Sequence, residues 1–301
     1  MSRIANLAPN PPSPTASSPF AGLIRMPGQY LCPDGVVFDE LERAIRRHLF
    51  KQVLPSLKGR VERYLIIQGP RGTGKTVSAT DASLRYGFAV ALLPASMLAS
   101  EHEGGACAVL NDFMSFAAET SRSRKMRIAI VADDFDLSIS AADGQMGRTI
   151  NSLLVTHQLQ QLADTQEPRN FDDSGMAIIF TGNNFTTMRA WLFREGRATW
   201  HTHRPTLDDK LAIAFQLFNP RSYDDRRLIE RLVRTYRDES VAFWRALYSD
   251  LMTDRLDDII SRSLPDVSAA EAEFRRPVPI DGVKLSALAR VRAKTRPMSF
   301  L

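Results

Sequence analysis

The fold is decided by the stretch Tyr64-Leu65-Ile66-Ile67-Gln68-Gly69-Pro70-Arg71-Gly72-Thr73-Gly74-Lys75-Thr76. Its first five residues are typical of a short buried strand, and a helical pattern follows from Val77 to Tyr86. A loop of the form G-x-x-x-x-G-K-[ST] between a strand and a helix is the context in which such a loop binds phosphate. The sequence therefore predicts a phosphate-binding loop, with a chance glycine turn as the alternative.

The residue types of this loop suit a nucleotide with its metal ion. Glycines let the backbone wrap closely around phosphate oxygens, where a side chain would collide. The backbone N–H groups and the positive end of the following helix attract the anion. Lys75 is expected to reach the β- and γ-phosphates, and the hydroxyl of Thr76 to bind Mg²⁺. We therefore expect Gly69 to Val77 to hold the nucleotide.

Length and composition limit the class of protein. The 301 residues allow one large domain or two smaller ones, and 44% of them are apolar, as is ordinary for a globular protein. A net charge of +5 is too small to establish nucleic-acid binding. Cys32 and Cys107 form no metal or redox motif, so we expect a reducing compartment. The cytoplasm is preferred to an organellar stroma. No apolar run approaches the ~18 residues of a membrane span, so no membrane partner is expected.

Strand and helix patterns alternate through the first two thirds of the chain. After the phosphate loop, apolar runs typical of buried strands occur at 88–93, 127–132 and 176–180, with helical spacing between them. This alternation predicts an α/β fold with a parallel sheet covered by helices on both faces. In such sheets ligands bind at the carboxyl ends of the strands. We predict that residues 34–220 form this nucleotide-binding domain.

The remaining segments differ from this pattern. Residues 1–33 are rich in Pro, Ser and Ala and contain no acidic residue, so a disordered tail is expected, with a transit peptide as the alternative. Residues 221–276 carry apolar residues at helical spacing, which predicts a small all-helical lid domain of three helices. Residues 277–301 are expected to form a basic tail.

Polar residues follow two of the predicted strands. Asp133 and Asp134 come after the run 127–132, where ATPases place the acidic pair that holds and uses Mg²⁺. Asp133 would bind the ion and Asp134 would polarise the attacking water, although exposed acids in a turn are the alternative. Asn183 follows the run 176–180, and its amide can hold the water by donating and accepting at once. Gly-Asn pairs also form ordinary turns.

Two arginines lie downstream in the segment 191–197. Arg194 and Arg197 could reach the nucleotide of a neighbouring subunit and neutralise charge in the transition state, as arginine fingers do. The alternative is a pair of surface arginines next to Glu195.

The run from Thr181 to Arg197 is the most specific part of the sequence. It reads TGNNFTTMRAWLFREGR and resembles the second region of homology of the AAA+ ATPases. Within that superfamily it is most similar to the plant-type Rubisco activases, whose pattern is Thr-Gly-Asn-Asp-Phe-Ser-Thr-Leu, then Leu-Ile-Arg-Asp-Gly-Arg. The similarity extends over roughly Tyr64 to Asp254 and includes Asp133-Asp134-Phe135-Asp136.

The resemblance implies a P-loop sheet of the AAA+ type followed by a helical lid. It also implies a homo-oligomeric ring, usually of six subunits, that hydrolyses ATP at subunit interfaces and pulls or presses on a protein client. The roles that follow by position are phosphate and Mg²⁺ binding for Lys75 and Thr76, the acidic pair for Asp133 and Asp134, the first sensor for Asn183, and the fingers for Arg194 and Arg197.

The chain departs from the family pattern in several places. The second-sensor arginine falls on Tyr248, with Arg245 nearby. The loop 97–105 takes the place of a central-pore loop without an aromatic residue, so His102 or Met97 would have to contact a client. Most AAA+ proteins have Glu where this chain has Asp134, although the activases also have Asp. The two ends of the chain do not match the activases, so the client need not be Rubisco.

Other functions stay open at this point. The basic residues from 284 to 296 would fit a loader or initiator that acts on nucleic acid, but no helix-turn-helix or aromatic-basic platform is present to favour it. The shorter Asp134 and the missing second sensor would fit a nucleotide-gated scaffold with little hydrolysis. His201 and His203 could bind a metal from one strand face, although no third ligand is evident.

Overall fold

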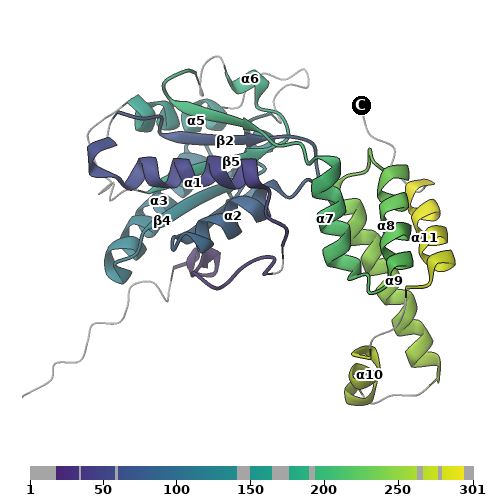
Figure 1. Cartoon of the computed structure of the whole chain (residues 1–301). Helices are drawn as coiled ribbons and strands as arrows, with labels where there is room; N and C mark the ends of the chain where they lie inside the picture. The colour runs from purple at the N-terminus through teal and green to yellow at the C-terminus, as the bar shows by residue number, and fades with distance from the viewer. Residues whose placement is uncertain are drawn as a thin grey trace, which may run out of the picture.

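The computed structural model describes residues 18–33, 35–57, 60–140, 150–164, 176–189, 194–262, 267–276 and 280–294. A six-stranded sheet with helices on both faces is followed by a bundle of helices (Figure 1). This is the predicted α/β fold with a helical region after it. Across the ranges just given, no helix is both long and apolar enough to span a bilayer.

The sheet is parallel except at one edge. Its strands lie in the order β1-β3-β4-β5-β2-β6, and only β1 pairs with its neighbour in the antiparallel sense. The bounds are β1 (Ile24–Arg25), β2 (Tyr64–Gln68), β3 (Ala89–Pro94), β4 (Ile128–Asp133), β5 (Ala177–Gly182) and β6 (Ala198–Thr202). The central strands are continuous apolar runs because both of their faces are covered.

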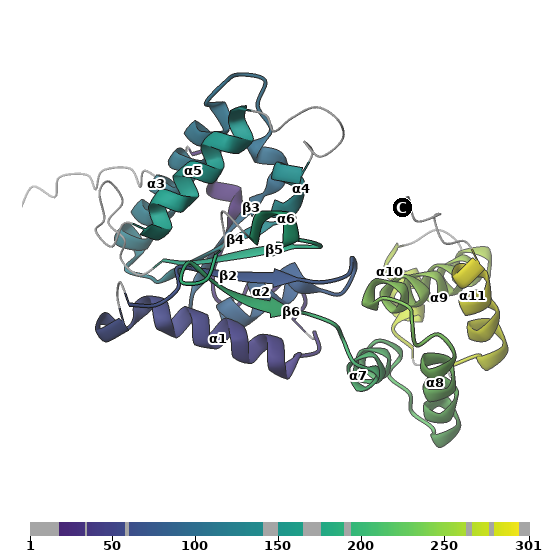
Figure 2. The same ribbon diagram turned by 90° about the horizontal axis from the view of Figure 1, so that it is seen from above.

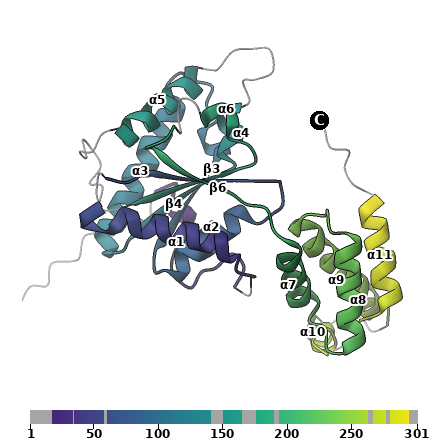
Figure 3. The same ribbon diagram turned by 45° about the horizontal axis from the view of Figure 1, so that its top comes forward.

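The helices of the α/β part form two layers. One face of the sheet carries α1 (Asp39–Val53) and α2 (Lys75–Arg85), and the other carries α3 (Gly105–Arg124), α4 (Phe135–Ser140), α5 (Ile150–Asp164) and α6 (Thr186–Arg189) (Figures 2 and 3). Side chains that alternate along β2 fill the two cores. Ile66 packs in the core that contains α3 and α5, whereas Leu65 and Ile67 pack in the core that contains α1 and α2.

The helical bundle differs in two ways from the sequence expectation. Its helices are α7 (Leu207–Phe218), α8 (Tyr223–Thr235), α9 (Val241–Arg262), α10 (Val267–Phe274) and α11 (Gly282–Lys294). The residues from Val241 onward form one long helix, where two were expected. α7 packs on α8 and α9, so the bundle begins before residue 221.

The segment expected as a basic tail contributes a packed helix. Leu285 and Ala289, spaced by one turn of α11, are fully buried against α8 and α9. Arg292 makes two hydrogen bonds to Asp250 of α9, with Nε to Oδ2 at 2.5 Å and Nη2 to Oδ1 at 2.6 Å. The expected basic tail is therefore part of the bundle up to Lys294, because acids on α9 neutralise its charge. Residues 295–301 lie outside the described ranges.

The N-terminal segment also differs from the expectation. Phe20 packs edge-on against Phe113 of α3, with ring centroids 5.5 Å apart, and β1 covers the outer edge of β3. The carboxylate of Asp81 accepts the backbone N–H groups of Leu31 at 2.7 Å and Cys32 at 2.9 Å. The prediction of a disordered tail is therefore wrong for the described residues from 18 to 33, while residues 1–17 lie outside the structure's description.

His48 of α1 generates a prediction about acid stability. The ring is fully buried, and its Nε2 donates to the carbonyl oxygen of Ile178 at 3.1 Å. Burial lowers the pKa of His48 from 6.5 to about 3. The unfolded chain therefore binds a proton first as the pH falls. The stabilisation is complete above pH 6.5 and is lost as the pH falls towards 3.

We expect the free energy of unfolding to fall by about 1.4 kcal/mol per pH unit in this window through His48 alone. His48→Gln keeps a donor for Ile178 but does not titrate, so it should show a shallower acid slope in urea unfolding. Equal slopes in the two proteins would contradict this assignment.

Candidate functional site

The phosphate loop joins β2 to α2 in a conformation that needs its glycines. Gly69 has φ +157° and Gly72 has φ +69°, where L side chains are strained. A Cβ on Gly69 would lie 2.1 Å from the carbonyl oxygen of His203, and one on Gly72 would lie 2.8 Å from the Cβ of Ala242. The backbone at His203 and the first turn of α9 therefore lie so close to the loop that side chains at Gly69 and Gly72 would collide with them.

Lys75 lies inside the loop at the start of α2. Its ammonium donates to the carbonyl oxygens of Gly69 and Pro70, both at 2.9 Å, and to Oδ1 of Asn183 at 3.3 Å. Burial lowers the pKa of Lys75, and three nearby aspartates oppose that effect. The structure thus brings Lys75 and Asn183 together, at the point where phosphate oxygens would compete for the ammonium.

Three oxygen atoms converge next to Lys75. The hydroxyl of Thr76 donates to Oδ1 of Asp133, and the hydroxyl of Thr181 donates to the same oxygen at 2.9 Å. The two hydroxyls lie 3.1 Å apart. Hydroxyl and carboxylate oxygens fit Mg²⁺, which takes its other ligands from water and phosphate. Thr181 had no role in the sequence reading, because only the pairing of β4 with β5 brings it to Asp133.

Asp134 follows directly and has a strained backbone. Its φ is +49°, which is uncommon for a residue with a side chain and recurs at functional sites. Partial desolvation raises the pKa of Asp134, and the negative charges of Asp133 and Asp136 raise it further. A carboxylate whose pKa is raised is a better proton acceptor, which suits the predicted role of activating water.

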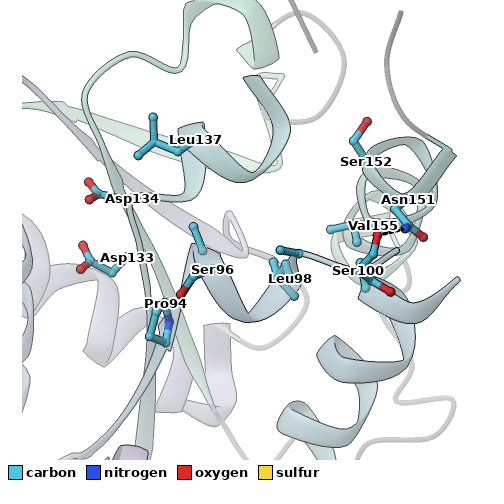
Figure 4. A pocket seen from close by; sticks show the side chains of 13 residues that line it. Pro94, Ser96, Leu98, Ser100, Asp133, Asp134, Leu137, Asn151, Ser152 and Val155 are labelled. Atoms are coloured by element: carbon cyan, nitrogen blue, oxygen red, sulfur yellow. Dashed lines mark hydrogen bonds between the residues drawn. The ribbon is translucent and has the colours of Figure 1, made fainter. Parts of the chain in front are cut away.

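A cavity of about 590 Å³ borders Asp133 and Asp134. Asp133 and Asp134 lie at one end of it, and Asn151, Ser152 and Val155 of α5 lie at the other (Figure 4). None of the residues that line it belongs to the phosphate loop. Asp134 is exposed and borders this cavity together with residues of η3 (Ala95–Leu98) and α5.

Asp136 is a site residue to which the sequence reading gave no role. It is 4% exposed, and its Oδ2 accepts the backbone N–H groups of Asn183 at 2.9 Å and Asn184 at 3.0 Å. A Cβ on Gly182 would lie 2.4 Å from Oδ1 of Asp136. Asp136 therefore fixes the end of β5 that carries Asn183. The signal in the sequence is the Asn183-Asn184 pair that follows the strand, because its N–H groups need an acceptor.

Asn151 was also missed, and it holds the loop 97–105, where the resemblance implies a central-pore loop. Its Oδ1 accepts the N–H of Gly104 at 2.8 Å, and its Nδ2 donates to the carbonyl oxygens of Ser100 at 3.1 Å and His102 at 2.9 Å. The loop is therefore tied to the first turn of α5. Met97 is partly buried against the sheet core, whereas His102 is exposed, so His102 is the more accessible of the two candidates.

Arg194 and Arg197 lie near the amino ends of the strands, at the edge of the sheet opposite to the one that carries the phosphate loop. The carbonyl oxygen of Arg197 accepts the N–H of Tyr64 at 3.1 Å, and Tyr64 begins β2, whereas the phosphate loop follows its end. A five-residue strand spans about 16 Å, which is longer than an arginine side chain. These arginines therefore do not reach the phosphate loop of their own chain. Residues 190–193 of the same segment lie outside the described ranges.

His203 and Tyr248, which falls at the second-sensor position, contact other residues of their own chain. His203 is buried, and its Nε2 donates to the carbonyl oxygen of Thr73 in the phosphate loop at 3.0 Å. The part of the chain that the structure describes contains no group of three or more His, Cys, Asp or Glu that could hold a metal. Tyr248 packs edge-on against Phe218, with ring centroids 5.8 Å apart, and Arg245 is exposed on α9.

Comparison with known proteins agrees with this geometry. Residues 65–206 match the model of the family described as ATPase family associated with various cellular activities (AAA). The ribulose bisphosphate carboxylase/oxygenase activase of a Nostoc species is 30% identical over 245 residues, which cover 76% of this chain and 59% of the relative. The chloroplastic activase of Chlamydomonas reinhardtii is 27% identical over 226 residues, 70% of this chain and 54% of the relative. The chain thus spans little more than half the length of these relatives.

The position of Asp136 predicts a specific defect. Asp136→Ala leaves the N–H groups of Asn183 and Asn184 without their acceptor, so Asn183 should move relative to Lys75. A displacement of about 1 Å costs roughly 10²-fold in turnover, so we expect kcat for ATP to fall by that order while the Kd for ATP changes less than about threefold. Steady-state hydrolysis and nucleotide titration measure the two quantities.

Asp112→Ala, which removes an exposed acid on α3, is the matched control and should behave as wild type. Wild-type kcat in Asp136→Ala would show that Asn183 does not depend on this carboxylate.

Proposed function

Because the chain belongs to the AAA family of ATPases and is similar to Rubisco activases, we propose that it hydrolyses ATP at the interfaces of a ring and thereby remodels a protein client. One observation carries the proposal. The phosphate loop, Asp133, Asp134 and Asn183 lie at one edge of the sheet, and both arginines lie at the other. A complete site then needs two copies of the chain.

The proposed roles follow from the contacts at the carboxyl ends of the strands. Gly69 to Val77 hold the phosphates, with Lys75 inside the loop as their counter-charge. The hydroxyl of Thr76 and the carboxylate of Asp133 hold Mg²⁺, which would neutralise charge on the phosphate oxygens. Asn183 orients the attacking water, and a carboxylate oxygen of Asp134 accepts its proton as the oxygen–phosphorus bond forms and ADP leaves.

The arginines complete the site from the neighbouring subunit. Arg194 is 62% exposed, so its guanidinium is available at the surface. An arginine supplied by a neighbour stabilises charge on the transferring phosphate and is worth about 10³–10⁵ in turnover. Both Arg194 and Arg197 were proposed for this role from the sequence, and they belong to the same short turn.

The client is proposed as a protein that contacts the exposed loop around His102. The activases carry the name of Rubisco, which makes Rubisco one candidate client for this chain. A ring of six subunits is the proposed assembly, because that number is usual in the superfamily. Cys32 and Cys107 are both free thiols, which fits the proposed reducing, cytoplasmic location.

A nucleic-acid partner is less well supported than a protein client. Two of the basic residues on α11 that motivated it are engaged within the bundle: Arg292 with Asp250, and Lys284 with Asp254. Phosphate binding would have to displace these partners first. A protein client therefore remains the preferred proposal.

Subunit mixing tests the shared site. Arg194→Ala should lower kcat by about 10³-fold or more. The phosphate loop, called the cradle below, is intact in this variant, but the guanidinium that the neighbouring subunit supplies is missing. Lys75→Ala should be inactive because its cradle is damaged. Mixing the two inactive proteins should restore hydrolysis well above the sum of their separate rates, since some interfaces then combine an intact cradle with an intact arginine. Hydrolysis per subunit should also rise with wild-type concentration.

Arg122→Ala is the matched control, because Arg122 is a half-exposed arginine whose pair with Glu119 on α3 contributes little. It should leave turnover unchanged. If hydrolysis does not recover on mixing and turnover is independent of protein concentration, the shared-site proposal is contradicted.

A further inference from the structure

Arg194 and Arg197 lie on one turn but in different environments. The side chain of Arg194 is 62% exposed, and its nearest Nη2–Oδ1 contact with Asp164 is 4.0 Å. The side chain of Arg197 is only 10% exposed, and it binds Asp164 through two hydrogen bonds, from Nε to Oδ1 at 2.7 Å and from Nη2 to Oδ2. A planar, two-point pair of this kind fixes orientation as well as distance.

Asp164 holds this pair from a rigid element. It is the last residue of α5, whose residues Val155 and Leu159 are each 2% exposed in the sheet core. The hydroxyl of Tyr64 donates to the carbonyl oxygen of Leu159 at 2.6 Å and ties the helix to β2. The negative end of a helix also favours a guanidinium at this position. Asp164 is therefore a fixed acceptor.

The backbone of the turn is fixed through Arg197 as well. The N–H of Arg197 donates to the carbonyl oxygen of Arg194 at 3.0 Å, and its own carbonyl oxygen accepts the N–H of Tyr64 at 3.1 Å. Gly196 between them has φ +88° with nothing within 4 Å of an added Cβ, so its conformation rather than space requires glycine. Every polar group of Arg197 named here serves its own chain.

Removing Arg197 from Asp164 would be costly. The guanidinium is largely out of solvent. A buried charge that is left without its partner destabilises the folded chain by more than the intact pair stabilises it. A neighbour's nucleotide would have to compete with a two-point carboxylate contact for Arg197. Within the described ranges, the side-chain contact of Arg194 that it would have to displace is the one of 4.0 Å with Asp164.

We propose that the two arginines have different functions: Arg197, locked on Asp164, positions the turn from which Arg194 alone reaches the nucleotide of the neighbouring subunit. Asp164 is then a positioning residue for hydrolysis, acting through Arg197. This inference rests on the proposed function, in which the arginines act across a subunit interface. It assigns to Asp164, which the sequence analysis did not single out, a defined effect on turnover.

The test compares Asp164→Asn with Arg197→Ala, because each removes the same pair from one side. If the pair of Arg197 with Asp164 positions Arg194, both variants should lose turnover by a similar factor of about 10- to 100-fold. The double variant should be no worse than either single variant. The Kd for ATP should stay within about threefold of wild type, since the cradle lies at the other edge of the sheet. Asp164→Glu, which keeps the charge, should recover part of the loss.

Mixing with Lys75→Ala subunits shows which side of the site is damaged. These subunits lack the cradle lysine but keep Asp164, Arg194 and Arg197. They should therefore rescue Asp164→Asn, which keeps its cradle. An absence of rescue would mean that Asp164 serves only the folding of its own chain, and would overturn the inference. Thermal unfolding of Asp164→Glu and Asp164→Asn, measured in parallel, reports any loss of fold.

The opposite pattern would also overturn it. If Arg197 itself reaches the phosphate, Asp164→Asn should retain turnover near wild type while Arg197→Ala falls at least tenfold lower. That result leaves the shared site standing, because the mixture of Arg194→Ala with Lys75→Ala would still recover. Failure of that mixture sinks the proposed function instead, so the two failures are distinguishable.

Discussion

The active centre depends on a constraint of parallel sheets, in which strands that run in one direction end at the same edge. β2, β4 and β5 therefore bring the phosphate loop, Asp133 and Asn183 together, and Thr181 meets Asp133 only because β4 and β5 are neighbours. The same constraint sends Arg197, which precedes β6, to the other edge. One copy of the chain thus carries the two halves of the proposed site at opposite ends of its strands.

α5 connects these two edges. At its start, Asn151 holds the loop of Ser100 to Gly104 with three hydrogen bonds, and at its end Asp164 holds Arg197. The helix is 15 residues long, about 22 Å, and its middle is bound to β2 through Tyr64. A single helix therefore contacts both the exposed loop at its start and, at its end, the turn that carries Arg194.

Local patterns allowed the phosphate loop, the acidic pair and the order of strands and helices to be predicted, because each is encoded within a few neighbouring residues. Asp136, Asn151 and Asp164 could not be assigned roles in this way, since their partners lie 33 to 51 residues away in the chain. The basic segment at the end of the chain was misread for the same reason, because the charge of Arg292 on α11 is balanced by Asp250 on another helix. Composition alone likewise missed the burial of Phe20.

The most direct measurement of the shared site is a structure of the Asp134→Asn protein assembled with ATP, which the altered base should trap before hydrolysis. We expect a ring in which the guanidinium of Arg194 lies about 3 Å from the γ-phosphate held by the adjacent subunit, with Arg197 still bound to Asp164. A monomer with ATP bound, or a ring in which Arg194 contacts no nucleotide, would contradict it.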